Sequence, residues 1–65
     1  MTKEKLIRKI KKLAWGDILY GYDSKGNLIN INDYNEEQDV FTGYNADCKP
    51  LALKFEQLPS NLRGD

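Results

Sequence analysis

The sequence has no histidine and a single cysteine, and these shortages exclude several kinds of site. One cysteine cannot form a disulfide within the chain, and no histidine is present to help build a zinc site. Acid–base catalysis near neutral pH would then need another side chain with a shifted pKa, which requires a buried site. A chain of 65 residues has little core in which to bury one. We therefore expect a protein that is not an enzyme and that uses no cofactor.

The acidic stretch that begins at Asp33 partly resembles a calcium-binding loop. Oxygen-bearing side chains alternate from Asp33 as they do at the start of a calcium-binding loop. However, the sixth position is Gln38 and not glycine, and the twelfth is Tyr44 and not glutamate. We expect no bound metal, and we expect residues 33–38 to form a solvated connecting loop.

Long apolar runs are also missing from the sequence. No stretch matches the apolar centre of a signal peptide or the length that crosses a bilayer. The unpaired thiol of Cys48 fits a reducing compartment better than an oxidising one. These observations predict a cytoplasmic protein that is not inserted in a membrane.

What the sequence does contain is a short pattern that occurs twice, with an offset of 22 residues. Asp17, Gly21 and Tyr22 recur as Asp39, Gly43 and Tyr44, and conservative pairs fill five further positions. Each copy alternates apolar and polar residues around turn-forming residues, which is typical of a β-hairpin. We expect two similar hairpins, at about residues 17–33 and 39–56.

In the first copy, Asp23-Ser24-Lys25-Gly26 fits a type I turn with Gly26 at positive φ. This turn sets the register of the strands, so that Gly21 faces Ile29 and Leu19 faces Ile31 on one side of the ribbon. Tyr22 then faces Leu28, and Tyr20 faces Asn30, on the other side. The alternation of apolar residues selects the same inner face independently.

The second copy has a weaker turn, because Cys48 stands where Gly26 stood and a non-glycine residue is strained at positive φ. The same register pairs Gly43 with Leu51 and Phe41 with Leu53, and Phe55 continues the inner face. Pro50 has no N–H to donate, which indicates an edge strand or a bulge. The tail, residues 58–65, contains a helix-breaking proline, and we expect its end to fray.

An amphipathic helix is predicted before the hairpins, at about residues 2–15. Leu6, Ile10 and Leu13 recur at helical spacing, Thr2 is placed to cap the first turn, and Gly16 is placed to end the helix.

The whole chain then forms one small α+β domain, residues 1–65, with the helix packed on one face of a four-stranded antiparallel sheet. A small SH3-like barrel with an N-terminal helix is the alternative. The expected core comprises Leu6, Ile10, Leu13, Leu19, Ile29, Ile31, Phe41, Leu51, Leu53 and Phe55. On this inner face we interpret Gly21 and Gly43 as clearance for the helix.

Two segments resemble known repeats. The run from Gly21 to Leu28 resembles a unit of the tyrosine-aspartate repeats of large secreted proteins, and Gly21 to Gly43 is similar to bacterial tryptophan-glycine repeats. The first resemblance covers eight residues and the second about a third of the chain, and both consist mostly of hairpin-turn chemistry. Both families form long arrays, whereas this chain holds two copies, so neither resemblance assigns a family.

The outer sheet face is the first candidate site. In this arrangement three tyrosines point outward together, and tyrosine offers rigid contact area with a polar tip. This face predicts binding of a protein partner or of a second copy of the chain. The alternative is that cross-strand tyrosines only stabilise the hairpins. The candidate residues are Tyr20, Tyr22, Tyr44, Leu28 and Val40.

The second candidate site follows from an uneven distribution of charge. The net charge is zero, but residues 1–12 hold six basic side chains against one acidic one, and residues 13–65 hold four against nine. Clustered cations can bind phosphates, which supply most non-specific affinity for nucleic acid. The competing interpretation is that these basic residues only form the solvent-exposed face of the helix, which would have the same composition. The alternative function is therefore nucleic-acid binding through Lys5, Arg8, Lys9 and Lys12.

Overall fold

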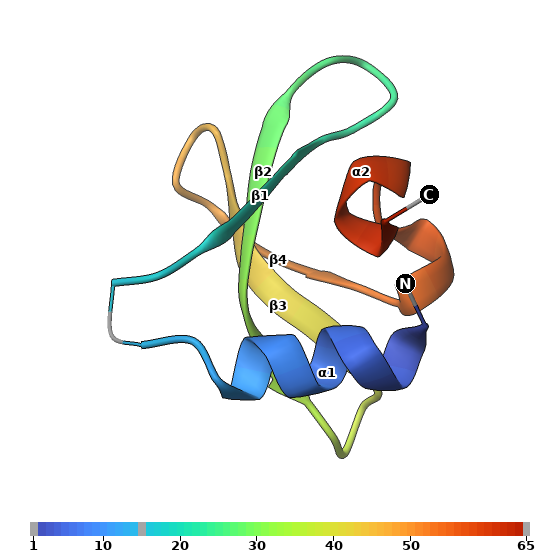
Figure 1. The fold of residues 1–65 in the computed structure, drawn as a ribbon. Coiled ribbons are helices and arrows are strands. Elements are labelled where there is room, and N and C mark those ends of the chain that lie inside the picture. Colours follow the sequence, from blue (N-terminus) through green and yellow to red (C-terminus); the bar gives the residue numbers. More distant parts are fainter. Residues whose placement is uncertain (1, 15, 65) are drawn as a thin grey trace.

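A computed structural model describes residues 2–14 and 16–64 and shows an N-terminal helix, a four-stranded antiparallel sheet and a short C-terminal helical segment (Figure 1). The strands lie in the order β1-β2-β3-β4, which confirms the predicted α+β fold. Within the described part of the chain, β1 and β4 are the two edges and do not pair, so the sheet is open and not a closed barrel. The elements are α1 (Lys3–Lys11), β1 (Leu19–Tyr22), β2 (Leu28–Asn35), β3 (Val40–Asn45), β4 (Pro50–Leu53), the 3₁₀ turn η1 (Phe55–Gln57) and α2 (Ser60–Arg63).

Helix α1 begins as predicted but ends earlier. The Thr2 hydroxyl accepts a hydrogen bond from the Lys5 N–H at 3.3 Å, which caps the first turn. The helix ends at Lys11, and the predicted end at residue 15 lies outside the described residues. A separate turn follows, in which the Ala14 N–H donates to the Asp17 carboxylate. Gly16 adopts the expected positive φ of 95°, but it does so in this turn and not as a helix cap.

The first hairpin has the predicted register throughout. Leu19 pairs with Ile31, Gly21 with Ile29 and Tyr22 with Leu28. The Asp23 carboxylate holds the turn, because its Oδ1 accepts the N–H groups of Lys25 at 2.9 Å and Asn27 at 2.8 Å. The Asn27 N–H is the main reason that the pKa of Asp23 lies below its ordinary value. Gly26 has a φ of 82°, as the turn type requires.

The second hairpin repeats this construction. Asn45 takes the role of Asp23, and its Oδ1 accepts from the Asp47 N–H at 2.9 Å and the Lys49 N–H at 3.0 Å. Cys48 takes the role of Gly26 at a φ of 60°. Gly43 pairs with Leu51 and Phe41 with Leu53, as predicted, and Pro50 lies in the edge strand β4. Strand β4 ends at Leu53, so the hairpin is shorter than the predicted range to residue 56.

The stretch between the two hairpins differs from the predicted connecting loop. Residues 33–35 extend β2 and pair with the start of β3, which leaves a tight turn over residues 36–39. The strand continues because Tyr34 packs on Phe41, with ring centroids 4.8 Å apart. A bulge between Ile31 and Asp33 shifts the register and allows this extension. The sheet is therefore a continuous meander of three hairpins.

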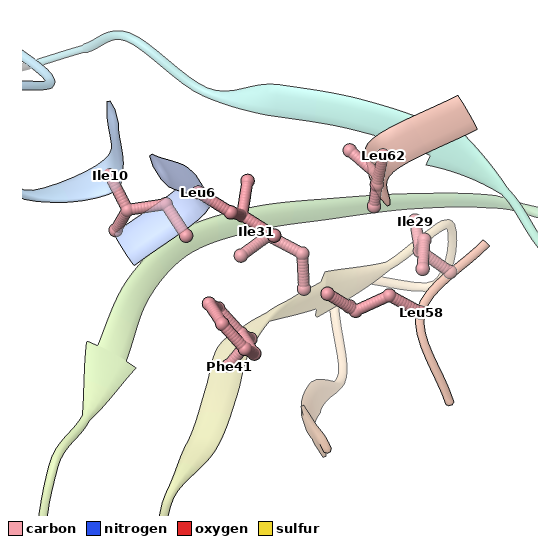
Figure 2. Packing of buried hydrophobic residues seen from close by; sticks show 7 residues of the cluster. All are labelled: Leu6, Ile10, Ile29, Ile31, Phe41, Leu58 and Leu62. Atoms are coloured by element: carbon pink, nitrogen blue, oxygen red, sulfur yellow. The ribbon is translucent and has the colours of Figure 1, made fainter. Parts of the chain in front are cut away.

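The core lies between α1, the inner sheet face and the C-terminal segment (Figure 2). Phe55 lies in η1 and not in a strand, but it packs against the core as predicted. Leu13 is half-buried and lies outside the cluster, because α1 ends before it. In the described part of the chain, the buried apolar side chains are Leu6, Ile10, Ile29, Ile31, Phe41, Leu58 and Leu62.

The C-terminal segment, which we expected only as a tail with a frayed end, contributes to the core in its described part. Leu58 and Leu62 are 3% and 6% exposed and belong to the core. Pro59 does not prevent helix α2, because it takes the N-cap position, where the absence of an N–H costs no helical hydrogen bond. The chain thus covers the sheet with two helical segments, one from each end of the sequence (Figure 1).

Both inner-face glycines allow close approach, but neither serves the predicted partner, α1. A Cβ atom on Gly21 would lie 2.6 Å from Leu62 Cγ, so this glycine admits α2. A Cβ atom on Gly43 would lie 1.8 Å from the backbone oxygen of Asn30, so this glycine admits the neighbouring strand β2. Gly43 therefore sets the path of the sheet beside the bulge.

Candidate functional site

A row of four side chains crosses the whole sheet on its outer face. Tyr20 of β1 pairs with Asn30 of β2, Asn30 pairs with Tyr44 of β3, and Tyr44 pairs with Pro50 of β4. Directly paired side chains on one face lie close enough to touch. The neighbouring residues along the strands are buried, as Ile31 and Gly43 are, or half-buried, so alternation directs this row away from the core. We call Tyr20, Asn30, Tyr44 and Pro50 the tyrosine row.

Among the described residues, the tyrosines of this face are the large apolar residues most open to solvent. Tyr20 and Tyr22 are each 57% exposed, and Tyr44 is 45% exposed. Tyr22 lies two residues beyond Tyr20 on the same face of β1 and pairs with the half-buried Leu28. The structure therefore brings these three tyrosines and Leu28 together, as predicted from sequence.

Val40, the fifth predicted residue, lies apart from this group. It pairs with Asn35 at the far end of β3, and Thr42 separates it from Tyr44 on the outer face. Four residues along a strand correspond to about 13 Å. The residue beside Tyr44 on the outer face is Pro50 and not Val40. The predicted pairing of Gly43 with Leu51 already implied that Tyr44 pairs with Pro50.

Asn30 fixes the centre of the tyrosine row. Its side-chain Oδ1 accepts a hydrogen bond from the Tyr44 backbone N–H at 2.9 Å. Its backbone oxygen lies against Gly43, where no Cβ obstructs it. The amide side chain thereby joins the two strands at the point where both carry the row.

A hollow of about 550 Å³ opens on the outer face of β2, β3 and β4, beside the tyrosine row. It lies at the bulge between Ile31 and Asp33, where the strand bends. Asp33 uses Oδ1 to accept the Tyr34 N–H at 2.8 Å. The hollow is lined by both apolar and polar side chains, namely Asn32, Asp33, Thr42, Tyr44, Pro50, Leu51 and Ala52, together with Gly43.

The edge of the sheet that carries Tyr20 and Tyr22 is held by the C-terminal helix. Asn61 of α2 accepts a hydrogen bond from the Tyr22 N–H through its Oδ1 at 3.4 Å. Leu62 packs over Gly21 on the inner side of the same strand. The C-terminal segment, which sequence reasoning left out of the core, therefore positions one end of the candidate site.

The basic helix presents two classes of cation. Lys3 and Lys11 reach the turn between β2 and β3, where Lys3 Nζ lies 2.6 Å from Asp39 Oδ2 and Lys11 pairs with Glu36. Both contacts are exposed to solvent, so each contributes little to stability. In the described residues, Lys5, Arg8, Lys9 and Lys12 form no ion pair, and all four are exposed.

The contacts at this turn shift the pKa values of their members. The hydrogen bond from Lys3, and after it the one from the Tyr34 hydroxyl, lowers the pKa of Asp39 below its ordinary value. The bond to Asp39 in turn raises the pKa of Lys3 and the pKa of Tyr34. Lys11 likewise lowers the pKa of Glu36. These groups join α1 to the turn through exposed contacts.

None of the helices in the described residues combines the length and the apolar character needed to cross a membrane. No group of three or more His, Cys, Asp or Glu side chains in residues 2–14 and 16–64 is arranged to hold a metal ion.

Comparison of this chain with models of known protein families, with curated proteins and with solved structures finds no match. The candidate surfaces must therefore be interpreted from their own geometry and chemistry.

Proposed function

We propose that this chain is a small non-enzymatic binding module whose outer sheet face binds a segment of another protein. The observation that supports this most directly is the exposure of Tyr20, Tyr22 and Tyr44 on one face, on the strands β1 and β3 that flank β2. Tyrosine is enriched at binding hot spots, and contiguous exposed apolar groups are less usual on a monomer than scattered ones. Stabilising the hairpins does not require that the rings remain this open to solvent.

The area of the face favours a short segment over a second copy of the chain. Four strands spaced by about 4.8 Å and four to eight residues long project an area of roughly 350 Å². A stable interface buries about 800 Å² on each partner, which this face alone does not offer. An extended segment needs only a strip, and the tyrosine row is such a strip across all four strands.

The chemistry of the row indicates the character of that segment. Tyr20, Asn30, Tyr44 and Pro50 are uncharged, so the matching residues of the partner are apolar or proline, which pack well on aromatic rings. The hollow beside Tyr44 and Pro50 offers a place for a side chain of the bound segment. The tyrosine hydroxyls and Asn30 provide polar groups that orient the segment.

We also propose that the protein works in the cytoplasm. Cys48 is an exposed free thiol in the turn between β3 and β4. An exposed thiol without a partner is better suited to a reducing compartment than to an oxidising one.

The proposal can be tested by selecting binders from a displayed library of random linear peptides on the immobilised wild-type protein. An enriched peptide is then titrated against Tyr20→Ser/Tyr44→Ser and against the control Lys25→Ser/Lys49→Ser, which shortens two exposed side chains at the hairpin turns. Two hot-spot side chains of about 2 kcal/mol each should together cost about 700-fold in affinity. The control should bind like the wild type.

Three outcomes would contradict the proposal. The first is a selection that enriches no peptide, and the second is equal affinity for the wild type and the tyrosine variant. The third is a mass, measured by light scattering after size exclusion, that doubles with concentration in the wild type but not in the tyrosine variant. That result would make a second copy the occupant of the face.

A further inference from the structure

We propose that α1 binds the phosphate backbone of double-stranded nucleic acid through four cations, which we call the basic stripe. The four residues are spaced at i, i+3, i+4 and i+7, and the last, the C-cap Lys12, keeps a right-handed helical backbone, so they lie on one side of the helix. Leu6 and Ile10, which are 1% and 4% exposed, fix the opposite side of the helix in the core. The stripe, Lys5, Arg8, Lys9 and Lys12, is therefore held outward by the packing of the fold.

The charge of the stripe is not neutralised within the described residues. The acidic turn between β2 and β3 pairs with the two cations that flank the core, Lys3 with Asp39 and Lys11 with Glu36. No ion pair or side-chain hydrogen bond involves the charged groups of the stripe in residues 2–14 and 16–64. Glu4 is the one acidic residue of α1, and it lies in the first turn. The fold thus leaves four positive charges together on one exposed surface.

The geometry favours nucleic acid over an anionic membrane. A basic helix binds a bilayer by burying an apolar face between the lipids, but here Leu6 and Ile10 are already buried in the protein core. From Lys5 to Lys12 the stripe runs about 10 Å along the helix axis. A nucleic-acid duplex presents one phosphate charge per ~1.7 Å of its axis, so several phosphates lie within reach of the stripe.

This binding would be independent of base sequence. Lysine and arginine contacts to phosphates position a protein but do not identify bases. The remainder of the chain, residues 13–65, has a net charge of −5, which repels a polyanion and restricts contact to the stripe. The inference also goes beyond the proposed protein-binding function, because α1 covers the inner face of the sheet and the tyrosine row lies on the outer face. An experiment can therefore disprove nucleic-acid binding without disproving protein binding, and the reverse.

The experiment is a titration of a fluorescently labelled mixed-sequence DNA duplex with the whole protein, followed by anisotropy at several salt concentrations. Contact of four cations with four phosphates predicts that log K falls against log salt with a slope of about −3.6. Affinity should then drop roughly 100-fold between about 50 and 200 mM salt. The variant Lys9→Gln/Lys12→Gln should reduce the slope to about −1.8.

The matched control is Lys25→Gln/Lys49→Gln, which removes the same charge from the hairpin turns and should leave the slope of the wild type unchanged. Circular dichroism of both variants shows whether α1 is retained, since glutamine and lysine have similar helix propensities. Four outcomes would overturn the inference. They are no binding of the duplex at about 50 mM salt, equal slopes for the two variants, tighter binding of the matching single strand, or binding of vesicles that contain anionic lipid without binding of the duplex.

Discussion

Gly21 of β1 lies directly beneath Leu62 of α2, so close that a Cβ atom on the glycine would come within 2.6 Å of Leu62 Cγ. This contact joins the C-terminal segment to the edge strand that carries Tyr20 and Tyr22. Asn61, the residue before Leu62, accepts the hydrogen bond from the Tyr22 N–H. The exposed tyrosines are therefore supported from behind by residues near the other end of the sequence.

Gly21→Ala tests this contact. The added methyl group overlaps Leu62, and overpacking of this kind costs about 1–3 kcal/mol of unfolding free energy. Leu62→Ala removes the obstructing atoms, so adding Gly21→Ala to that variant should cost much less. Urea denaturation of the four proteins in this double-mutant cycle measures the coupling. Strictly additive effects would show that Gly21 and Leu62 do not interact.

Leu62→Ala alone tests whether the C-terminal segment belongs to the core. Removing a buried leucine side chain costs about 2–5 kcal/mol, a large share of the stability of so small a protein. The matched control is Leu13→Ala, because Leu13 is half-buried and lies outside the core cluster. Thermal unfolding should show a much lower midpoint for Leu62→Ala than for Leu13→Ala. Equal midpoints would contradict the structure of the C-terminal segment.

The sheet could be predicted from sequence because local turn chemistry and apolar alternation specify the same register. Asp23 and Gly26 define the first turn, and the strand pairs from Leu19 to Tyr22 follow from it residue by residue. The exposure of the three tyrosines followed from the same register. These features depend on residues that are close in sequence, which is why one sequence sufficed.

The features that were not predicted depend on contacts between distant parts of the chain. We expected a helix-breaking proline and a frayed end in the tail, but Leu58, in an extended conformation, and Leu62 of α2 are both buried against core residues that are distant in sequence. The extension of β2 depends on the packing of Tyr34 against Phe41, which no local pattern shows. The partner of Gly21 could not be found before α2 was placed.

Cys48→Gly should stabilise the protein. Cys48 has a φ of 60° in a position where the equivalent residue of the first hairpin is Gly26. A non-glycine residue in this conformation is strained by about 1–2 kcal/mol, and part of that gain is offset because glycine makes the unfolded chain more flexible. We expect a net gain of about 1 kcal/mol in urea denaturation. The reciprocal change, Gly26→Ala, should destabilise, and a loss of stability in Cys48→Gly would contradict the assigned turn.

Stability in acid should depend on Asp39. Because Lys3 and Tyr34 lower the pKa of Asp39 in the folded protein, its carboxylate favours folding above the ordinary value of 3.8. That contribution is lost as the pH falls below 3.8 and through the lowered pKa. Asp39→Asn preserves the shape and tolerates the positive φ of 55°. Urea midpoints recorded from about pH 6 to about pH 2 should fall less steeply in this variant than in the wild type.

The control for this pH series is Asp47→Asn, another exposed carboxylate that forms no side-chain ion pair in the described residues. It should follow the wild-type profile. If Asp47→Asn and Asp39→Asn gave the same profile, the contact of Asp39 with Lys3 would have no measurable effect.

The proposed function requires that the outer sheet face binds a protein segment. The most direct measurement is an NMR titration, in which a peptide selected on the wild type is added to isotope-labelled protein and the amide signals are monitored. Chemical shifts should change along the tyrosine row and its hollow, at Tyr20, Tyr44 and Ala52, while amides near Arg8 and Lys12 stay unchanged. This pattern would locate the peptide on the outer face. Changes centred on α1 with an unperturbed tyrosine row would contradict the proposed function.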